Sequence, residues 1–306
     1  MRLFYLHSFL QHKVLVKHFI YSKMKANNFQ QSGGFEEVSA MIIVGEKLNS
    51  TLKVIRPAME NRDEQKVINL AKRQIEAGAS YLDLNTAMFG DAEVETMEWL
   101  VNTVQGVMNV PLTFDSPNPK VIKRALALNK NPKPMINSIT AETERFEGIA
   151  PLLSEYEASV IALCMDDSGM PETADDRFKI ADTLIENLTK LGIKLDDIYI
   201  DPMVRPVGTG SHYGIIALDT IRSVKRKFPE VHIMCGLSNI SFGLPARKLV
   251  NQVFLVSCMN AGMDGAILDP LDKKLMSFLY ASEAVLGLDD FCVNYLEKFR
   301  EGELEV

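Results

Sequence analysis

The chain has 306 residues, 47% of them hydrophobic, and its formal net charge at pH 7 is −7. That length suits one large globular domain or two small ones, and the acidic charge makes the chain a poor binder of nucleic acid or of an anionic membrane. No apolar run reaches the roughly eighteen residues of a membrane-spanning helix, and the four cysteines form no CxxC pair. We therefore expect a cytoplasmic protein with reduced, buried thiols that binds neither nucleic acid nor membrane.

The first forty residues differ in composition from the rest of the chain. They carry five basic residues, two acidic ones and three of the five histidines. Lys13, Lys17 and His18 interrupt the apolar stretch that a secretory signal peptide would need. Residues 30–34 are typical of a linker, and a strand pattern opens at Met41. We interpret residues 1–40 as an N-terminal extension, non-native or disordered, and a basic amphipathic docking arm is the alternative.

From Met41 onward, short apolar runs alternate with helical patterns. Apolar residues at three- and four-residue spacing predict the helices, as at Val67, Ala71 and Ile75. Eight runs have the length and composition of buried strands, and a helical pattern follows each one. These runs are 41–44, 81–84, 110–114, 134–136, 160–163, 198–200, 231–234 and 266–268.

This alternation predicts the α/β class, with one (β/α)8 TIM barrel over residues 41–306. Eight strand–helix units match the size of such a barrel, for which about 250 residues are typical. An open, doubly wound sheet is the alternative. It favours a glycine-rich phosphate turn after the first strand, and the sequence there is Gly45-Glu46-Lys47-Leu48-Asn49.

The residues after the predicted strands are rich in Asp and Asn, and the site of a barrel lies at these strand ends. A catalytic Cys–His or Ser–His pair is not expected there, and we interpret His232, in the middle of the seventh run, as structural. The residues at the strand ends include Glu46, Asn49, Asp83, Asn85, Asp115, Asn137, Asp201, Gly236, Ser238, Asn239 and Asp269.

Two kinds of ligand suit this mixture of carboxylates and amides. Carboxylates can hold Mg²⁺ or Mn²⁺, but amides are weaker ligands, so we expect no catalytic metal in this chain. A flat, nitrogen-rich heterocycle such as a pterin offers donors and acceptors to Asp and Asn. Capping of the next helix is an equally good explanation for any single residue, as at Ser116-Pro117 and Asp175-Asp176. The whole ring of strand ends therefore carries the inference.

Several motifs occur together between Met41 and about Leu286. They are Leu82-Asp83-Leu84-Asn85, Phe114-Asp115-Ser116, Ile136-Asn137-Ser138, Asp201-Pro202, Gly236-Leu237-Ser238-Asn239-Ile240-Ser241 and residues 266–272. In these motifs the chain resembles the methyltetrahydrofolate:corrinoid (iron-sulfur) protein methyltransferases. In broader outline it is similar to dihydropteroate synthases and to the folate domain of cobalamin-dependent methionine synthase. The resemblance implies a pterin-binding barrel of the dihydropteroate synthase-like type.

The resemblance also implies roles for individual residues. Asn239 is the implied catalytic residue, beside the methyl-bearing nitrogen. Phe242 departs from the family pattern, which often has Gln there. The implied pterin or folate contacts are Asp115, Asn137, Asp201, Gly236, Ser238, Asn239 and Arg247, and supporting positions are Glu46, Asn49, Asp83 and Asn85.

The implied reaction moves the methyl group of 5-methyltetrahydrofolate to the Co(I) corrinoid of a separate corrinoid protein, or runs in reverse. An amide is no acid near neutral pH, but Asn239 can accept a hydrogen bond from the leaving nitrogen once that nitrogen is protonated. We also expect a homodimer that works in one-carbon metabolism.

Two alternatives stay open. A dihydropteroate synthase-like enzyme carries a Ser-Arg-Lys-type motif after the seventh strand, where this chain has Ser238-Asn239-Ile240. A non-catalytic pterin-binding module is the other alternative.

Deletion of residues 1–40 is predicted to leave folding and methyl transfer intact, because the strand pattern begins only at Met41. Thermal melting of the full-length and truncated proteins checks this. A melting temperature lower by more than a few degrees would mean that the deleted segment packs on the barrel.

Overall fold

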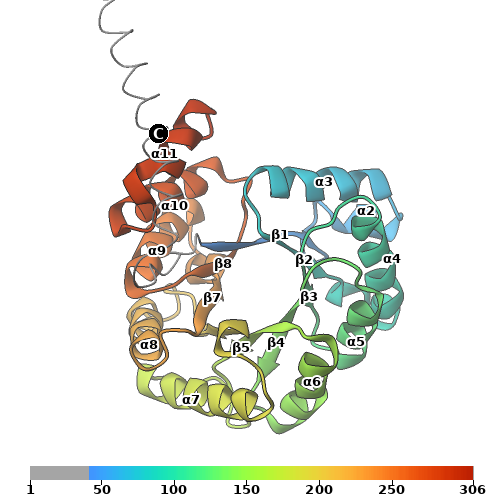
Figure 1. Cartoon of the computed structure of the whole chain (residues 1–306), viewed down its shortest axis with the longest axis horizontal. Helices are drawn as coiled ribbons and strands as arrows, with labels where there is room; N and C mark the ends of the chain where they lie inside the picture. The colour runs from blue at the N-terminus through green and yellow to red at the C-terminus, as the bar shows by residue number, and fades with distance from the viewer. Residues whose placement is uncertain (1–40, 306) are drawn as a thin grey trace, which may run out of the picture. The chain divides into compact units, whose positions relative to one another are not determined.

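Eight parallel strands form a closed barrel in the computed structural model, which describes residues 41–305 (Figure 1). The strands follow one another in sequence order, and β8 pairs with β1 to close the ring. Their bounds are β1 (Ile42–Asn49), β2 (Tyr81–Asn85), β3 (Leu112–Asp115), β4 (Met135–Thr140), β5 (Ser159–Leu163), β6 (Ile198–Asp201), β7 (His232–Gly236) and β8 (Gly265–Leu268). The predicted (β/α)8 barrel is confirmed, whereas the interpretation of residues 1–40 concerns a segment outside the described residues.

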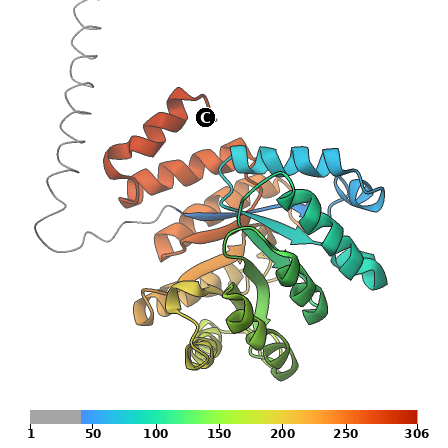
Figure 2. The same ribbon diagram turned by 45° about the vertical axis from the view of Figure 1, so that its right-hand side comes forward.

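Helices surround the strands on the outside of the barrel (Figures 1 and 2). Their bounds are α2 (Arg56–Glu60), α3 (Glu64–Glu76), α4 (Glu93–Gln105), α5 (Pro119–Leu128), α6 (Thr143–Tyr156), α7 (Ala174–Lys190), α8 (Tyr213–Lys227), α9 (Arg247–Ala261), α10 (Lys273–Leu286) and α11 (Val293–Arg300). Short 3-10 helices are η2 (Ala87–Ala92), η3 (Leu195–Asp197), η4 (Leu237–Ser241) and η5 (Asp290–Cys292). None of the helices within residues 41–305 has the length and apolar character needed to cross a membrane.

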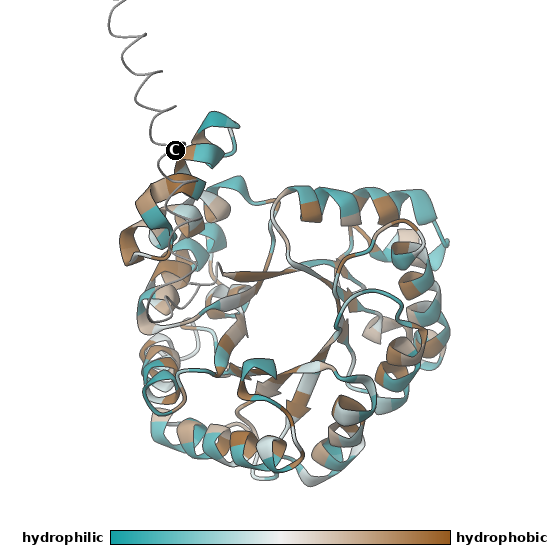
Figure 3. Ribbon diagram, in the orientation of Figure 1, coloured by the Kyte–Doolittle hydropathy of each residue, from teal (hydrophilic) through white to brown (hydrophobic). Residues whose placement is uncertain are grey.

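Two apolar layers hold the barrel together, one on each face of the strands. The larger layer packs between strands and helices and includes Leu82, Leu84 and Phe114, all with no exposed surface. Figure 3 shows the apolar strands inside a ring of helices that carry both apolar and polar residues. The smaller layer fills the barrel interior and consists of Val44, Met135, Ile161, Tyr199 and Met234.

The alternation of side chains along each strand places polar groups above this interior layer. Neighbouring residues of a strand point to opposite faces, so residues two apart share a face. Asn137 therefore lies on the same face as Met135, and Asp201 on the same face as Tyr199. The interior layer thus forms an apolar floor, and carboxylates and amides stand above it at the carboxyl ends of the strands.

His232 lies at the opposite end of the barrel. It is the first residue of β7, where the sequence predicted the middle of a strand. Its Nδ1 is 3.0 Å from Asp264 Oδ2, and its ring stacks on Tyr199 with 4.7 Å between the ring centroids. These contacts agree with the structural interpretation of His232.

The structure corrects two predicted helix starts. Asn118, and not Ser116-Pro117, caps α5: its side chain accepts a hydrogen bond from the Lys120 N–H, and Pro119 is the first helical residue. Thr173 caps α7, and Asp175-Asp176 lie inside its first turn. Each correction shifts the helix start by about one or two residues, because a side chain with a free oxygen stands just before the predicted cap or just after it.

Candidate functional site

Asn85, Asp115 and Asn137 stand side by side at the carboxyl ends of β2, β3 and β4. Asn85 pairs in register with Asp115, and Asp115 with Asn137. The Asn85 amide Nδ2 donates a hydrogen bond of 2.7 Å to Asp115 Oδ2, while its Oδ1 accepts one of 3.1 Å from Ser50 Oγ. The amide is therefore oriented from both sides, and it fixes one oxygen of Asp115 while the other remains available.

Asp83 lies one layer deeper on the same wall and is 1% exposed. Burial raises its pKa well above the ordinary value, the nearby Asp115 charge raises it further, and a hydrogen bond from Asn137 lowers it. Its Oδ1 has no hydrogen-bond partner among residues 41–305. A buried, unsatisfied carboxyl oxygen is costly, so this group is suited to a ligand with N–H donors.

Asp201 ends β6, on the far side of the ring from β2, and is 8% exposed. Burial raises its pKa, whereas the Met203 N–H, the Arg177 charge and the Gly236 N–H lower it, and the net pKa is about 7. The Met203 N–H donates to Asp201 Oδ1 at 2.7 Å. The carboxyl group is therefore held in place on one side, and it titrates near neutral pH.

Burial also raises the pKa of Asp115 to about 6, while the Asn85 amide and the Arg145 charge lower it. Arg145, on α6, donates to the backbone oxygens of Ser116 and Ser138, both at 2.9 Å. Arg145 therefore connects the residue after β3 to the backbone of β4 itself, and its charge acts on Asp115. Sequence reasoning missed Arg145, although its position four residues before the buried Ile149 on α6 is a detectable signal.

The short helix η4 carries Ser238 and Asn239 directly after β7. Arg247 Nη2 donates to the Ser238 carbonyl oxygen at 2.7 Å, and its Nε donates to Ser241 Oγ at 3.1 Å. Asn239 is exposed. A side chain at Gly236 would bring its Cβ to 3.3 Å from Asn239 Nδ2, so glycine permits the Asn239 amide to lie over the end of β7.

The end of β1 closes the ring on the side of β8. Lys47 Nζ and Asp269 Oδ2 form an ion pair of 2.8 Å. Burial raises the pKa of Glu46 to about 7, Lys47 and Arg247 lower it, and Asp269 raises it. Asn49 Oδ1 accepts hydrogen bonds from the backbone N–H and the hydroxyl of Thr51, so its amide oxygen serves a local turn.

The strand ends thus combine paired carboxylates and amides with an exposed aromatic residue. Phe242 is 68% exposed beside η4, with its ring centroid 5.8 Å from the Arg247 guanidinium carbon. Among residues 41–305, no group of three or more His, Cys, Asp or Glu side chains is placed to hold a metal ion. The carboxylates and amides at the strand ends offer a ligand both hydrogen-bond acceptors and donors.

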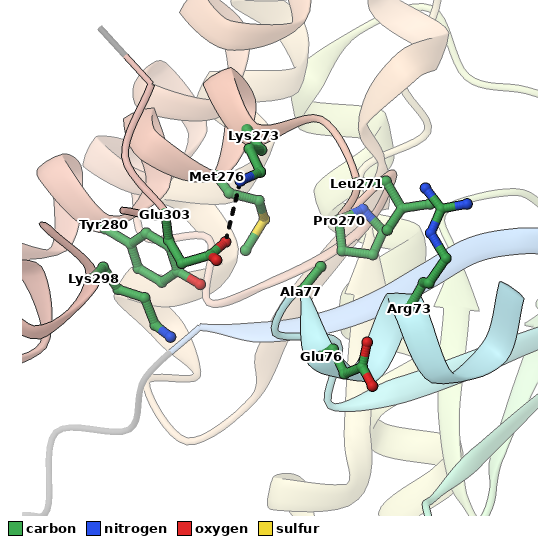
Figure 4. Close-up of a pocket in the computed structure, with 10 residues that line it drawn as sticks. All are labelled: Arg73, Glu76, Ala77, Pro270, Leu271, Lys273, Met276, Tyr280, Lys298 and Glu303. Carbon is green, nitrogen blue, oxygen red and sulfur yellow. Dashed lines mark ion pairs between the residues drawn. The ribbon is translucent and has the colours of Figure 1, made fainter. Parts of the chain in front are cut away.

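Two cavities lie outside this ring of strand ends. One, of about 250 Å³, is lined by residues of α3, α10 and α11 and of the loop after β8; Figure 4 shows Arg73, Tyr280 and Lys298 on its walls. The other, of about 260 Å³, lies beside the starts of α9 and α10. None of the predicted site residues lines either cavity, so the site is defined by its chemistry and not by these hollows.

Comparison with known proteins adds three findings. A family described as "Pterin binding enzyme" matches residues 45–269. The methylcorrinoid:tetrahydrofolate methyltransferase of Eubacterium limosum is 35% identical over 266 residues, which cover 86% of this chain and 98% of that protein. Methionine synthase of Mycobacterium leprae (strain TN) is 34% identical over 246 residues, but the match spans only 20% of that longer protein.

Solved structures share the fold at low identity. Dihydropteroate synthase of Yersinia pestis aligns with a TM-score of 0.60 at 16% identity, over 82% of this chain and 94% of that one. Dihydropteroate synthase of Xanthomonas albilineans with 4-aminobenzoic acid aligns with a TM-score of 0.63 at 15% identity, over 81% of this chain and 94% of that one. These similarities concern the barrel alone.

The stability of the Asp83→Asn variant relative to the wild-type protein is predicted to increase as the pH rises from 5 to 8. The pKa of Asp83 is higher in the folded protein than in the unfolded chain, so the free energy of unfolding of the wild-type protein falls as the pH rises toward the folded-state pKa. The amide of the Asn variant does not titrate, so that variant does not show this loss. Thermal melts of both proteins across this range measure the difference.

Asp264→Asn is the matched control. Burial raises the pKa of Asp264, but His232 and Lys225 lower it more, so the net pKa is below the ordinary value. The ionised carboxylate therefore stabilises the folded protein at every pH above its unfolded-state pKa, and Asp264→Asn should lower stability throughout the range from pH 5 to 8. An Asp83→Asn effect that stays constant with pH would contradict the raised pKa of Asp83.

Proposed function

This chain belongs to the pterin-binding enzyme family, and from that premise we propose that it transfers a methyl group between N5 of tetrahydrofolate and the corrinoid of a separate protein. The observation that carries the proposal is the set of carboxylates and amides at the strand ends, which has the hydrogen-bonding pattern of a pterin edge. The name of the Eubacterium limosum relative, which spans nearly the same length, supports the same reaction. Either direction of transfer is compatible with this site.

We assign the pterin to the space between two walls of the barrel. Asp115 and Asn137 stand on one wall and Asp201 on the other. Carboxylates accept hydrogen bonds from ring N–H and amino groups, and an Asn amide offers one donor and one acceptor group. The free oxygen of Asp83 provides a further acceptor below them. A flat heterocycle above the apolar floor then meets partners on both edges.

Asn239 is the proposed catalytic residue. A tertiary amine leaves readily only when its nitrogen is protonated or strongly hydrogen-bonded. The Asn239 amide, exposed at the barrel mouth over the end of β7, is suited to accept a hydrogen bond from that protonated nitrogen. This contact strengthens as positive charge develops, so it stabilises the transition state more than bound substrate.

The partner is a corrinoid protein, and its Co(I) centre supplies a strong nucleophile when it is bound. This chain positions the methyl group and leaves it reachable from solvent, since Asn239 and Phe242 are both exposed. We propose that the chain itself contributes no metal. The exposed apolar Leu249 and Val253 on α9 support a homodimer, and the buried free thiols of Cys164, Cys235 and Cys258 support a cytoplasmic location.

A dihydropteroate synthase-like reaction has less support from the same residues. That reaction releases diphosphate, for which a cation after β7 is needed. Residues 237–241 contain no Lys or Arg, and Arg247 donates instead to the Ser238 carbonyl oxygen.

Asn239→Ala is predicted to lower the single-turnover rate of methyl transfer by a factor of about 100, or ~2.7 kcal/mol, with substrate affinity less affected. Asp201→Ala, in contrast, should raise the Kd for methyltetrahydrofolate tenfold or more, about 1.4 kcal/mol. Rapid-mixing absorbance that follows the loss of Co(I), together with calorimetry, separates rate from affinity.

Asn239→Ser distinguishes catalysis from a structural role, because Asn239 lies inside η4 and caps neither η4 nor α9. A serine keeps a polar side chain but cannot reach the same nitrogen, so the Ser variant should be as slow as the Ala variant. Wild-type rate in the Ser variant would end the catalytic assignment. Folate binding without turnover by the wild-type protein would instead indicate a non-catalytic binding module.

A further inference from the structure

Arg177 is a fully buried cation on α7 that no local sequence motif explains. The face of α7 that it occupies is otherwise apolar, with Ile180, Ala181 and Leu184 following at helical spacing. Burial of an arginine is costly, because the guanidinium stays charged and loses its water. Such a group is expected to have specific partners in the protein interior.

The hydrogen-bond partners of Arg177 belong mainly to the turn after β6. Nη1 donates to the carbonyl oxygens of Pro202 and Met203, at 2.8 and 2.9 Å, and Nε donates to Pro171 at 3.3 Å. Met203 adopts a left-handed conformation with φ of 60°, which a methionine seldom adopts without support. The guanidinium therefore holds the backbone of a strained turn.

That turn determines how Asp201 is presented. The Met203 N–H donates a hydrogen bond to Asp201 Oδ1 at 2.7 Å. The same residue whose carbonyl oxygen accepts from Arg177 therefore also fixes one oxygen of the Asp201 carboxyl group. The other Arg177 amino group, Nη2, has no hydrogen-bond partner among residues 41–305. Three elements thus meet at this point: α7, the turn after β6 and the strand end itself.

The charge of Arg177 has few neighbours that balance it. Its hydrogen bonds go to backbone carbonyl oxygens, and the nearby Glu172 forms its ion pair of 2.7 Å with Arg205 instead. The ionisable groups that face Asp201 are Arg177 from α7, Cys164 after β5 and Cys235 on β7. Burial raises the pKa of the Cys164 thiol. The pKa of the Cys235 thiol is raised mainly by a hydrogen bond with Cys258 and also by burial, so both thiols stay neutral.

We propose that Arg177 is a positioning residue for the substrate: it holds the turn that orients Asp201, and it supplies the buried positive charge that the Asp201 carboxylate requires. This inference rests on the proposed function, in which Asp201 accepts hydrogen bonds from the pterin. A protonated carboxyl group has lost an acceptor site, so it holds the pterin edge less well.

A pH dependence follows from this arrangement. Burial raises the pKa of Asp201, and the Met203 N–H, the Arg177 charge and the Gly236 N–H oppose that rise, with the balance at about 7. Substrate binds the ionised form, so affinity is full above that pH and falls below it. Without the charge on Arg177, the midpoint moves to higher pH and affinity at neutral pH drops.

The test compares three variants with the wild-type protein. Arg177→Gln removes the charge. Arg177→Lys keeps the charge but loses the Nε hydrogen bond to the Pro171 carbonyl oxygen and the rigid, planar guanidinium that holds Nη1 at the Pro202 and Met203 carbonyl oxygens. Arg205→Gln is the matched control, because Arg205 lies in the same turn region but pairs with Glu172 and faces Tyr213. Two quantities are measured for each: the titration of Asp201 in the ligand-free protein, and the Kd for tetrahydrofolate from pH 5 to 9. The titration uses NMR of ¹³C-labelled aspartate, assigned with Asp201→Asn.

Arg177→Gln should raise the Asp201 midpoint by roughly one pH unit or more, and should weaken tetrahydrofolate binding at pH 7 by about fivefold or more, because less of Asp201 is then ionised. Arg177→Lys keeps the charge but loosens the turn that carries the Met203 N–H, so it should raise the midpoint less than Arg177→Gln does and weaken binding at every pH. Arg205→Gln should change neither quantity. A role confined to stability would lower the melting temperature of the Arg177 variants without moving the midpoint.

A folded Arg177→Gln protein with the wild-type midpoint would overturn the electrostatic part of the proposal. Should that variant not fold, Arg177→Lys still decides the positioning part, which wild-type affinity in this variant would overturn. Failure of the wild-type protein to bind tetrahydrofolate would count against the proposed function instead, while the ligand-free titration would still report on Arg177.

Discussion

Burial raises the pKa of several carboxyl groups at one end of the barrel, and among them Asp83, Asp115 and Asp201 need compensation before any ligand arrives. Asp115 has the Asn85 amide, Asp201 has the Met203 N–H, and Asp83 retains one oxygen without a partner. A buried carboxylate is costly in an apolar setting unless it is hydrogen-bonded or paired with a charge. The raised pKa values of these groups express that cost, and a ligand rich in N–H donors relieves it.

Both the strands and the surrounding helices position these carboxyl and amide groups. The strands set the spacing, since register places Asn85, Asp115 and Asn137 in one row. Two arginines of the surrounding helices, Arg145 on α6 and Arg177 on α7, donate to backbone carbonyl groups at or just beyond the carboxyl ends of the strands. Loops that carry a binding site are thereby anchored to rigid elements, which favours a site that is organised before its substrate binds.

The sequence could predict the barrel and the residues at its strand ends because both depend on local patterns. A short apolar run followed by Asp or Asn marks the end of a buried strand, as at Asn85, Asp115 and Asp201. The family resemblance added roles for particular residues, and these roles remain proposals.

What the sequence did not predict depends on contacts between distant residues or on fine local competition. Arg145 and Arg177 act on carbonyl groups that no local motif specifies, although each stands on the buried face of its helix. The helix start at Pro117 was wrong because Asn118 competes as a cap and Pro119 follows it. Helix α11 was missed because Phe299 and its other apolar residues stay at least partly exposed and form no buried stripe.

A crystal structure of the protein with bound tetrahydrofolate tests the central claim most directly. We expect the pterin ring between the two walls of the barrel, within hydrogen-bond distance of Asp115, Asn137 and Asp201, with N5 toward Asn239. A folate bound elsewhere, for example in the cavity between α3 and α10, would contradict the assignment of the site.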